Sequence, residues 1–223
     1  MGLRNRAPAP FLITGIICLL LFGVIAWGVY LESNWIKSFD LSWIDRIQGS
    51  VSEKKTAFIM IITELGSMQA VIGLTIIICI VLFFKRKFAE GLWFGGTILF
   101  CAAIGGKVLK KSFDRERPAF LQLIEKTNES FPSGHATATS IFYGFISIVL
   151  ILTTIQIWKK VIIGFITIVW IGFILFTRVY LGAHFPSDVL AGFLYGLAVV
   201  FISIAVFLLV RQPLRKILKQ PEI

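Results

Sequence analysis

Three short polar clusters contain the residues of this sequence that are best suited to chemistry. They hold both histidines of the 223-residue chain, three cations and an aspartate, and each lies at or next to the end of an apolar run. The clusters are Lys110 with Arg117-Pro118, then Pro132-Ser133-Gly134-His135, then Arg178 with His184 and Asp188. Arginine binds phosphate oxygens through paired N–H groups, and lysine binds them as a point charge. Because phosphoryl transfer depends mainly on positioning and charge stabilisation, the clusters together predict a site for that reaction.

The central cluster predicts the start of a helix that faces an anion. Pro132 disfavours helix at the residue before it, Ser133 is a good N-cap, and Gly134 permits close approach of a ligand to the backbone. A helix that begins here directs free N–H groups and the positive end of its dipole toward an anion, above all phosphate. We therefore expect Ser133 and Gly134 to bind phosphate, with His135 beside it in the first turn.

The third cluster could supply a nucleophile together with a carboxylate that orients it. Asp188 follows His184 by four residues, across a turn leading into a helix, so its carboxylate could reach an imidazole N–H. Such a bond would orient the ring and raise its basicity, as in a catalytic triad. His135 has no such partner in the sequence and could remain protonated beside the anion as an acid.

Each cluster also has a simpler structural interpretation. Lys110 and Arg117 alone would be a solvated pair of charges at the membrane interface, and Arg178 alone would be a snorkelling side chain. His184 could be a satisfied interface histidine. Asp188 could simply begin a helix, since aspartate favours helix N-termini. All three clusters in this order, at one membrane face and with no histidine elsewhere, favour the catalytic interpretation.

The composition indicates an integral membrane protein. The chain is 57% hydrophobic, carries 15% charged residues and has a mean hydropathy of +0.87, whereas a soluble domain carries about 25% charge. Several apolar runs reach the roughly 20 residues that a helix needs to span a bilayer. The net charge of +10 then indicates membrane orientation and anionic lipid rather than nucleic acid. The three cysteines lie inside apolar runs without metal-ligand spacing, so we expect them to be small buried apolar residues.

We expect an all-α membrane bundle of six transmembrane helices that forms a single domain over 1–223. The spans are predicted at about 11–31, 57–84, 90–109, 133–158, 161–177 and 189–210. The first follows Arg4 and Arg6 but lacks a clear cleavage site, so a retained span is expected rather than a signal peptide. Glu64, near the start of the second span, is interpreted as a solvated interface residue, although an ionisable residue there can also be functional.

The segment 33–55, between the first two spans, has the pattern of an amphipathic helix. Trp35, Phe39, Trp43 and Ile47 recur every four residues, with charged residues between them. Such a helix could lie in the membrane interface or could pack on the spans as a loop helix. Both alternatives place it on the same face of the membrane.

Six spans place both termini on one face, and the basic residues predict which face that is. Dense, nearly acid-free clusters of Lys and Arg mark the cytoplasmic side of a membrane protein. They are Arg4 with Arg6, Lys85-Arg86-Lys87, Lys159-Lys160 and the tail from Arg211 to Lys216. The other face has as many Lys and Arg residues, but these are spread through longer loops with most of the acids. We therefore expect cytoplasmic termini and a site on the outer face of a bacterial plasma membrane.

The chain resembles the type 2 phosphatidic acid phosphatase superfamily of integral membrane lipid phosphatases over essentially its whole length. The residues that match its three motifs are Lys110-(six)-Arg117-Pro118, Pro132-Ser133-Gly134-His135 and Arg178-(five)-His184-(three)-Asp188. The sequence departs from the family pattern at Thr177, where the family usually has serine, although the hydroxyl is kept. Asp114 and Glu116 are less usual inside the first motif and could tune headgroup preference.

That resemblance implies a role for each residue. His184 would attack phosphorus to form a phosphohistidine, Asp188 would orient His184, and His135 would protonate the leaving oxygen before water hydrolyses the intermediate. The phosphate oxygens would be held by Lys110, Arg117, Ser133, Gly134 and Arg178. No metal or other cofactor is implied, and the sequence has no His/Asp/Glu cluster at metal-ligand spacing.

The small six-span form is similar to bacterial membrane enzymes of the phosphatidylglycerophosphatase B and undecaprenyl diphosphate phosphatase types. This implies hydrolysis of a lipid phosphate, with phosphatidylglycerophosphate as the first choice of substrate and undecaprenyl diphosphate as the alternative, or both. A lipid phosphotransferase, and a lipid-phosphate transporter or sensor in which the cations only bind, stay open as other functions. The implied partners are the lipid substrate and the bilayer, with no nucleic acid and no obligatory protein partner.

Overall fold

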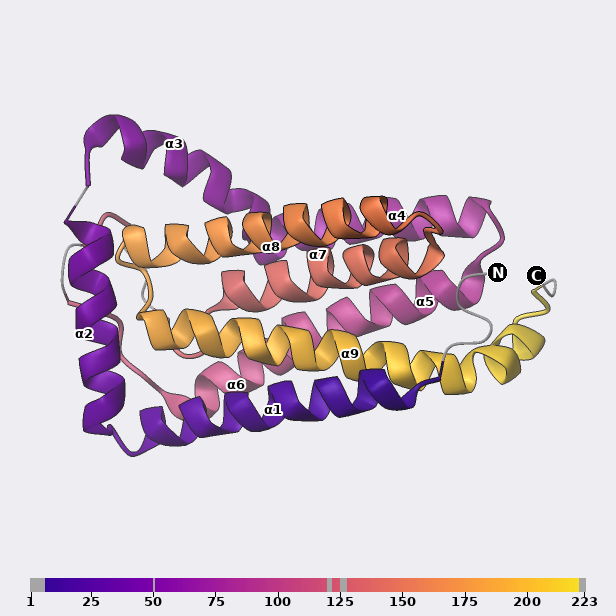
Figure 1. Cartoon of the computed structure of the whole chain (residues 1–223), viewed down its shortest axis with the longest axis horizontal. Helices are drawn as coiled ribbons and strands as arrows, with labels where there is room; N and C mark the ends of the chain where they lie inside the picture. The colour runs from indigo at the N-terminus through magenta and orange to yellow at the C-terminus, as the bar shows by residue number, and fades with distance from the viewer. Residues whose placement is uncertain (1–6, 50, 120–121, 125–127, 221–223) are drawn as a thin grey trace.

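Helices alone make up the regular secondary structure of the described residues, and the long ones run side by side along one axis (Figure 1). The computed structural model describes residues 7–49, 51–119, 122–124 and 128–220. In chain order the α-helices are α1 (Ala9–Tyr30), α2 (Asn34–Gln48), α3 (Glu53–Thr63), α4 (Met68–Phe84), α5 (Phe88–Thr97), α6 (Gly106–Phe113), α7 (Gly134–Thr153), α8 (Ile157–Tyr180) and α9 (Pro186–Ile217). The predicted all-α class is confirmed for this part of the chain.

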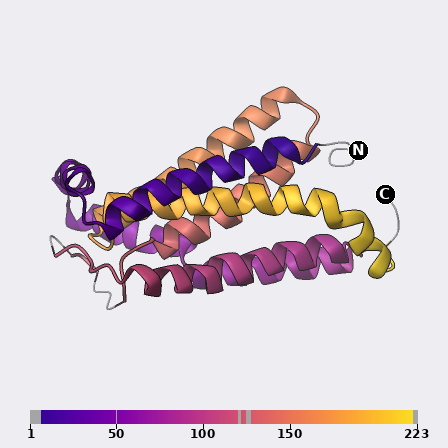
Figure 2. The same cartoon turned by 90° about the horizontal axis from the view of Figure 1, so that it is seen from below.

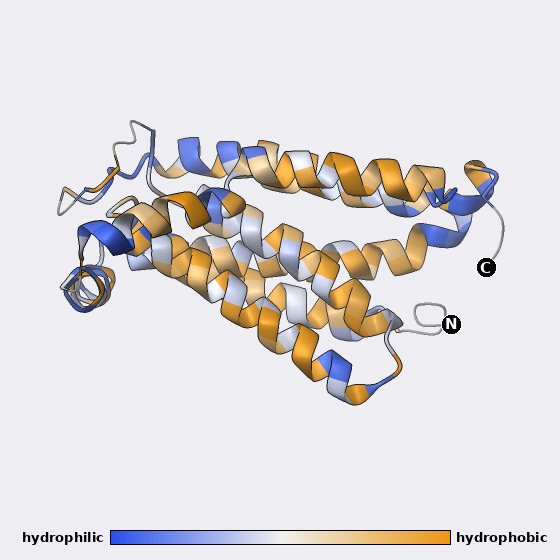
Figure 3. Ribbon diagram, turned by 90° about the horizontal axis from the view of Figure 1, so that it is seen from above, coloured by the Kyte–Doolittle hydropathy of each residue, from blue (hydrophilic) through white to orange (hydrophobic). Residues whose placement is uncertain are grey.

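Among the described residues, five continuous helices are long and apolar enough to cross a membrane. They are α1, the joined helix Phe88–Phe113, α7, α8 and α9. The joined helix contains α5 and α6 with a π-helical segment, η2 (Ile98–Gly105), between them. Apolar residues cover the length of the bundle and polar residues gather at its ends (Figure 3). This distribution agrees with helices that span a bilayer.

The run predicted as one span over 57–84 is divided into two helices. α3 and α4 meet at a 3₁₀ turn, η1 (Glu64–Gly66), and are bent by 47°. Ser67 caps α4, because its hydroxyl accepts a hydrogen bond from the N–H of Ala70 at 3.2 Å. Gly66 lies so close to α7 and α8 that a Cβ there would be 2.5 Å from side-chain atoms of both helices. The prediction of one continuous helix over 57–84 is therefore wrong, because the structure has two helices joined by a bend.

Other predicted boundaries also differ from the observed helices. α7 ends at Thr153 rather than Trp158, which belongs to the first turn of α8. Because apolar residues flank this turn on both sides, composition does not reveal it. α8 and α9 extend beyond 161–177 and 189–210, since helical hydrogen bonding continues into their polar flanks. The segment 33–55 is divided between α2 and α3.

The start of α1 and the end of α9 lie at one end of the bundle, and α2 crosses the opposite end (Figures 1 and 2). The basic clusters 85–87 and 159–160 lie at the end that carries the start of α1. Arg4 and Arg6 form another of the basic clusters that we expect on the cytoplasmic side, but they lie outside the described residues. The ends of α6 and α8 and the starts of α7 and α9 lie at the α2 end. The three polar clusters therefore meet there.

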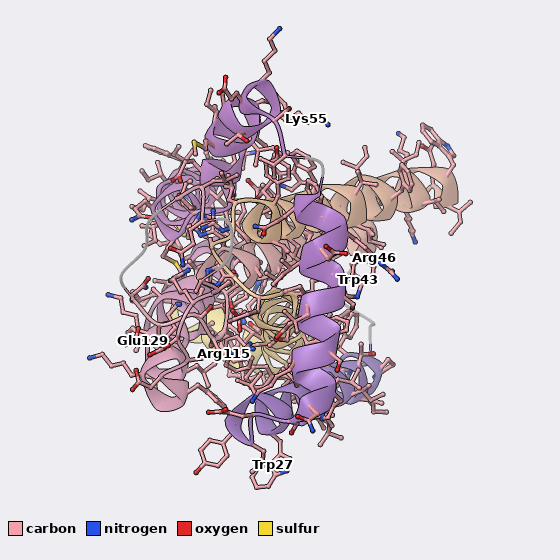
Figure 4. The ribbon with its side chains drawn as sticks, turned by 90° about the vertical axis from the view of Figure 1, so that its left-hand side faces the viewer. Trp27, Trp43, Arg46, Lys55, Arg115 and Glu129 are labelled. Atoms are coloured by element: carbon pink, nitrogen blue, oxygen red, sulfur yellow. The ribbon has the colours of Figure 1, made fainter. Side chains whose placement is uncertain are left out.

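α2 packs across this end of the bundle through one face. Ile36, Asp40 and Ile44 are buried on that face, whereas Trp43 is 44% exposed. Figure 4 shows Arg115 and Trp43 on opposite sides of α2. The buried face therefore carries a carboxylate in line with two isoleucines, and the tryptophan faces outward.

α9 packs against α7 through small residues one turn apart. A Cβ on Gly192 would lie 2.7 Å from the carbonyl oxygen of Ser133, and one on Gly196 would lie 2.5 Å from the Cβ of Ser140. Only glycine permits so close an approach of two helices. This packing also lets the N–H of Ser133 donate to the carbonyl oxygen of Asp188 at 3.0 Å. The second and third polar clusters are thus joined through the main chain.

Candidate active site

A cavity of about 470 Å³ lies where the three polar clusters meet. Six of the eight predicted site residues line it, namely Lys110, Arg117, Gly134, His135, Arg178 and His184. The other two, Ser133 and Asp188, are fully buried next to lining residues. On another side the cavity is lined by apolar residues of α4 and η2, including Met68, Ile72 and Ala102. The cavity therefore combines a cationic wall with an apolar one.

His184 occupies the loop between α8 and α9 and is only 3% exposed. Its Nε2 lies 3.3 Å from Nη1 of Arg117, and both residues line the cavity. Its Nδ1 lies 3.4 Å from the hydroxyl oxygen of Ser130. Burial, and then the charges of Arg117, Arg178 and Lys110, hold the pKa of His184 well below its usual range. The imidazole is therefore neutral at neutral pH, as a nucleophile must be.

Asp188 is fully buried in the first turn of α9, and its carboxylate is shared among several donors. Oδ2 accepts hydrogen bonds from the N–H of Phe185 at 2.9 Å and from the hydroxyl of Ser130, while Oδ1 pairs with Arg115. The distance from Oδ2 to Nδ1 of His184 is 3.6 Å, which is too long for a hydrogen bond. The predicted direct bond is thus not formed, because Ser130 and Phe185 already donate to the same oxygen. Asp188 also caps α9, as in the simpler structural interpretation, because its carboxylate accepts from the N–H of the N-cap residue Phe185.

Two cations of the first cluster are held by carbonyl oxygens around the cavity. Lys110 donates to the carbonyl oxygen of Glu129. Arg117 donates from Nε to the carbonyl oxygen of Asn128 at 2.7 Å and from Nη2 to the Asn128 side chain at 2.8 Å. Its Nη1 donates to the carbonyl oxygen of Ala183, the residue before His184. These contacts fix Arg117 between the loop that precedes α7 and the loop that carries the histidine.

Arg178 is a buried cation with an unsatisfied donor. Its side chain is 1% exposed, and Nη1 donates to the hydroxyl of Thr63 at 3.0 Å. That hydroxyl lies 2.8 Å from the hydroxyl of Thr177, the position at which the sequence departs from the family pattern. Nε of Arg178 has no hydrogen-bond partner among the described residues. Because buried N–H groups rarely stay unpaired, this donor indicates a place for an anion in the cavity.

The start of α7 forms the remaining wall. Ser133 caps α7, since its hydroxyl accepts from the N–H of Ala136 at 3.5 Å, and its side chain does not line the cavity. Gly134 and His135 do line it. A Cβ on Gly134 would lie 3.9 Å from Cε of Lys110, so the backbone of the first turn faces that lysine. The predicted helix start is therefore observed beside the predicted cation.

Comparisons with known proteins agree with this geometry. The family model of the PAP2 superfamily matches residues 90–211, which include all three polar clusters. The chain belongs to the PAP2 superfamily. The resemblance inferred from the three clusters is thus confirmed.

Relatives of this PAP2 protein are named as lipid phosphatases. Phosphatidylglycerophosphatase B of Bacillus subtilis is 38% identical over 149 residues, which are 63% of this chain and 70% of the relative. Lipid A 1-phosphatase of Rhizobium johnstonii is 30% identical over 118 residues, 47% of this chain and 44% of the relative. Undecaprenyl-diphosphatase of Sulfolobus acidocaldarius is 34% identical over 96 residues, 43% of this chain and 42% of the relative.

Two solved structures share the fold of this PAP2 protein. The crystal structure of the PAP2-type phosphatidylglycerolphosphate phosphatase from Bacillus subtilis has a TM-score of 0.73 and 30% sequence identity, and the alignment covers 85% of this chain and 94% of that one. The crystal structure of Aquifex aeolicus LpxE has a TM-score of 0.56 and 25% identity, covering 76% and 93%. The multi-span membrane architecture is therefore that of PAP2 phosphatases.

Sequence reasoning missed three polar residues of this PAP2 protein that are linked to Asp188, two of them directly and one through Arg115. Ser130 and Arg115 both contact Asp188, and Asp40 contacts Arg115. Ser130 and Arg115 look like ordinary loop residues in the sequence. Asp40 did carry a signal, because it lies four residues from both Ile36 and Ile44 and so belongs to the apolar face of α2. No group of three or more His, Cys, Asp or Glu side chains that could hold a metal occurs in the described ranges.

Proposed function

We propose that the protein is a membrane phosphatase that hydrolyses the phosphate group of a lipid at the membrane–water interface. The observation that carries this proposal is one cavity that is lined by a buried histidine, four cationic residues and an apolar wall. A phosphate fits beside the cations, and an acyl or prenyl chain fits against the wall of α4 and η2. The named activities of the relatives support the same conclusion.

The proposed reaction begins with His184. Its Nε2, which contacts the cavity residue Arg117, attacks phosphorus, while His135 donates a proton to the alcohol oxygen as the P–O bond breaks. The phosphohistidine then reacts with water, from which His135 removes a proton, and inorganic phosphate is released. Lys110, Arg117 and Arg178 stabilise the charge on the phosphoryl oxygens throughout. Ser133 and Gly134 contribute through the start of α7, and Asp188 orients the nucleophile.

Phosphatidylglycerophosphate is the proposed substrate. The match to Phosphatidylglycerophosphatase B of Bacillus subtilis covers 70% of that relative, and a solved phosphatidylglycerolphosphate phosphatase has a TM-score of 0.73 with this chain. Hydrolysis of this substrate requires only that the site cleave a phosphate monoester. Transfer to a second alcohol instead of water would produce a phosphotransferase, and an assay of labelled products with and without added acceptor lipids separates the two.

A lipid diphosphate is the second candidate substrate, and one lysine favours it. Lys107 lines the cavity one helical turn before Lys110. A diphosphate whose terminal phosphate lies beside Lys110 would place its inner phosphate near Lys107, on the side of the lipid chain. Lys107→Ala should then reduce kcat/KM for undecaprenyl diphosphate at least fivefold more than for phosphatidylglycerophosphate. Equal losses for the two substrates would remove this argument.

The experiment that tests the function is phosphate release by the purified protein from a panel of lipid phosphates and diphosphates. His184→Ala should abolish turnover while retaining most of the affinity for inorganic phosphate. Preserved turnover in His184→Ala would overturn the nucleophile assignment. Binding without turnover in the wild-type protein would instead support a transporter or sensor.

The proposal includes a membrane topology for the single domain over 1–223. The bent pair of α3 and α4 serves as one of six spans, α2 lies in the outer membrane interface, and both termini are cytoplasmic. Exposed tryptophans on α2 and the basic clusters at the opposite end support this arrangement. Asp45→Cys should react with an impermeant thiol reagent on intact cells, and Lys85→Cys only after lysis. The reverse pattern would invert the topology.

A further inference from the structure

Asp40 is a buried carboxylate on α2 that contacts two elements of the candidate site. Its side chain is 2% exposed and accepts hydrogen bonds from Ser187 and Arg115. Oδ1 accepts from the N–H of Ser187 at 2.8 Å. Oδ2 accepts from the hydroxyl of Ser187 and from Nη2 of Arg115, each at 2.8 Å. A buried ionised carboxylate is tolerated only when it is paired and hydrogen-bonded in this way.

Arg115 connects this carboxylate to Asp188. Its Nη1 pairs with Oδ1 of Asp188 and donates to the hydroxyl of Ser187 at 2.8 Å, while Nη2 pairs with Asp40. The guanidinium also lies over the ring of Phe185, 4.2 Å from its centroid. One planar cation thus bridges two carboxylates from distant parts of the chain, with a separate terminal nitrogen of the guanidinium facing each of them.

The bridge determines which oxygen of Asp188 faces the histidine. Because Arg115 holds Oδ1, Oδ2 is left to accept from Phe185 and Ser130 and lies 3.6 Å from Nδ1 of His184. Without Asp40, Arg115 would lose one of its two carboxylate partners, and its side chain could turn toward the anion-binding cavity or solvent. Asp188 and the first turn of α9 would then be less firmly fixed.

We propose that Asp40 and Arg115 are positioning residues, which hold Asp188 and Ser187 in place and thereby fix the orientation of the His184 ring. This inference rests on the proposed function of His184 as nucleophile. It assigns to α2 a part in the reaction, in addition to any contact with the membrane. Substrate phosphate would be bound by the cations of the cavity, so the pair should affect the chemical step and not substrate affinity.

Asp40→Asn tests the proposal, with Asp45→Asn on the exposed face of the same helix as the matched control. Phosphate release from phosphatidylglycerophosphate in mixed micelles should show a kcat lower by roughly 10- to 100-fold in Asp40→Asn, since small misplacements of a reacting group have effects of this order. KM and the inhibition constant for inorganic phosphate should stay within about twofold of wild type. Asp45→Asn should match the wild-type protein in all three quantities.

Thermal unfolding of the same samples separates positioning from a structural role. A purely structural Asp40 would lower the unfolding temperature and leave the kcat of the folded protein unchanged, and that result would overturn the proposal. If Asp40→Asn does not fold, Arg115→Lys tests the bridge from its other end, because an ammonium group lacks the two separate terminal nitrogens that face the two carboxylates. Arg115→Lys should show the same loss of kcat at unchanged KM, and wild-type kcat would count against the bridge.

A double-mutant cycle tests whether Asp40 acts through Arg115. The factor by which Asp40→Asn lowers kcat should shrink severalfold when Arg115→Gln is already present. The same factor in both backgrounds would contradict the proposed coupling. Failure of the proposed function is recognised separately, because the wild-type protein would then release no phosphate, or His184→Ala would release as much as wild type.

Discussion

Nδ1 of His184 and Oδ2 of Asp188 lie 3.6 Å apart, and the hydroxyl of Ser130 contacts both atoms. The serine oxygen lies 3.4 Å from Nδ1 and donates its proton to the carboxylate. A hydroxyl group thus lies between the carboxylate and the imidazole and contacts both. This differs from a triad in which histidine and aspartate are bonded directly.

Ser130→Ala should lower kcat about tenfold. Loss of a hydrogen bond to a charged group costs about 1.5 kcal/mol or more, and here the lost bond supports the carboxylate that faces His184. Ser112→Ala is the matched control, because Ser112 is an exposed serine that bonds only within α6. Steady-state phosphate release at saturating substrate measures the effect. Equal activity of the two variants would show that Ser130 is dispensable.

The activity should persist to lower pH than an ordinary histidine would permit. Burial and three nearby cations depress the pKa of His184, so the neutral, nucleophilic form is retained below about pH 6.5, the usual value for histidine. Arg117→Gln removes one of these charges and should move the acidic limb of the kcat/KM profile to higher pH. Arg46→Gln, which changes an exposed cation on α2, should leave the limb in place. A limb that does not move in Arg117→Gln would contradict the electrostatic cause.

Folding stability should depend on pH through the same group. Since the folded protein holds His184 neutral, protonation favours the unfolded chain, and the stabilising contribution is present above about pH 6.5 and declines as the pH falls below it. His184→Gln should reduce this dependence relative to wild type. Chemical unfolding between pH 5 and 8 in the same detergent checks it, and parallel curves for the two proteins would exclude the contribution.

Adjacent lysines on α6 should differ in importance. Lys110 lines the cavity, whereas Lys111 is exposed and does not. Lys110→Ala should lower kcat/KM roughly 100- to 1,000-fold, the range for loss of one group that stabilises transition-state charge. Lys111→Ala should remain within about twofold of wild type. Similar losses in both variants would indicate a general effect of positive charge rather than a specific contact.

The contact between α7 and α9 should limit both stability and activity. Gly196→Ala places a Cβ 2.5 Å from that of Ser140, and overpacking of this kind costs about 1–3 kcal/mol. The displaced α9 would also carry Asp188 away from the start of α7. Gly172→Ala is the control, because no atom lies within 4 Å of its added Cβ. Unfolding temperature and kcat should both fall for Gly196→Ala alone.

The placement of the main site residues could be predicted because they lie at the ends of apolar runs. A histidine or arginine next to a span has few positions available, so Arg178 and His184 had to lie near one membrane face. Their partners could not be predicted in the same way. Ser130 and Arg115 are polar residues in a polar loop, and only tertiary packing turns them toward Asp188.

Helix boundaries show a similar division. Apolar runs predicted α1 within two residues, since polar segments flank it on both sides. The turn between α7 and α8 was missed because it is short and apolar residues flank it on both sides. The bend at Glu64–Gly66 depends on the contact of Gly66 with two other helices, which local sequence does not contain.

The first and last long helices pack side by side, with Gly15 of α1 close to Ile202 of α9. In a chain synthesised from its N-terminus, α1 enters the membrane long before its partner exists. Asp188 arrives only with α9, when the cations of the first cluster are already in place. A polypeptide interrupted before α9 would therefore contain the proposed phosphate-binding cations Lys110, Arg117 and Arg178 but would lack Asp188. We therefore expect lipid phosphate hydrolysis only from chains whose synthesis has included α9.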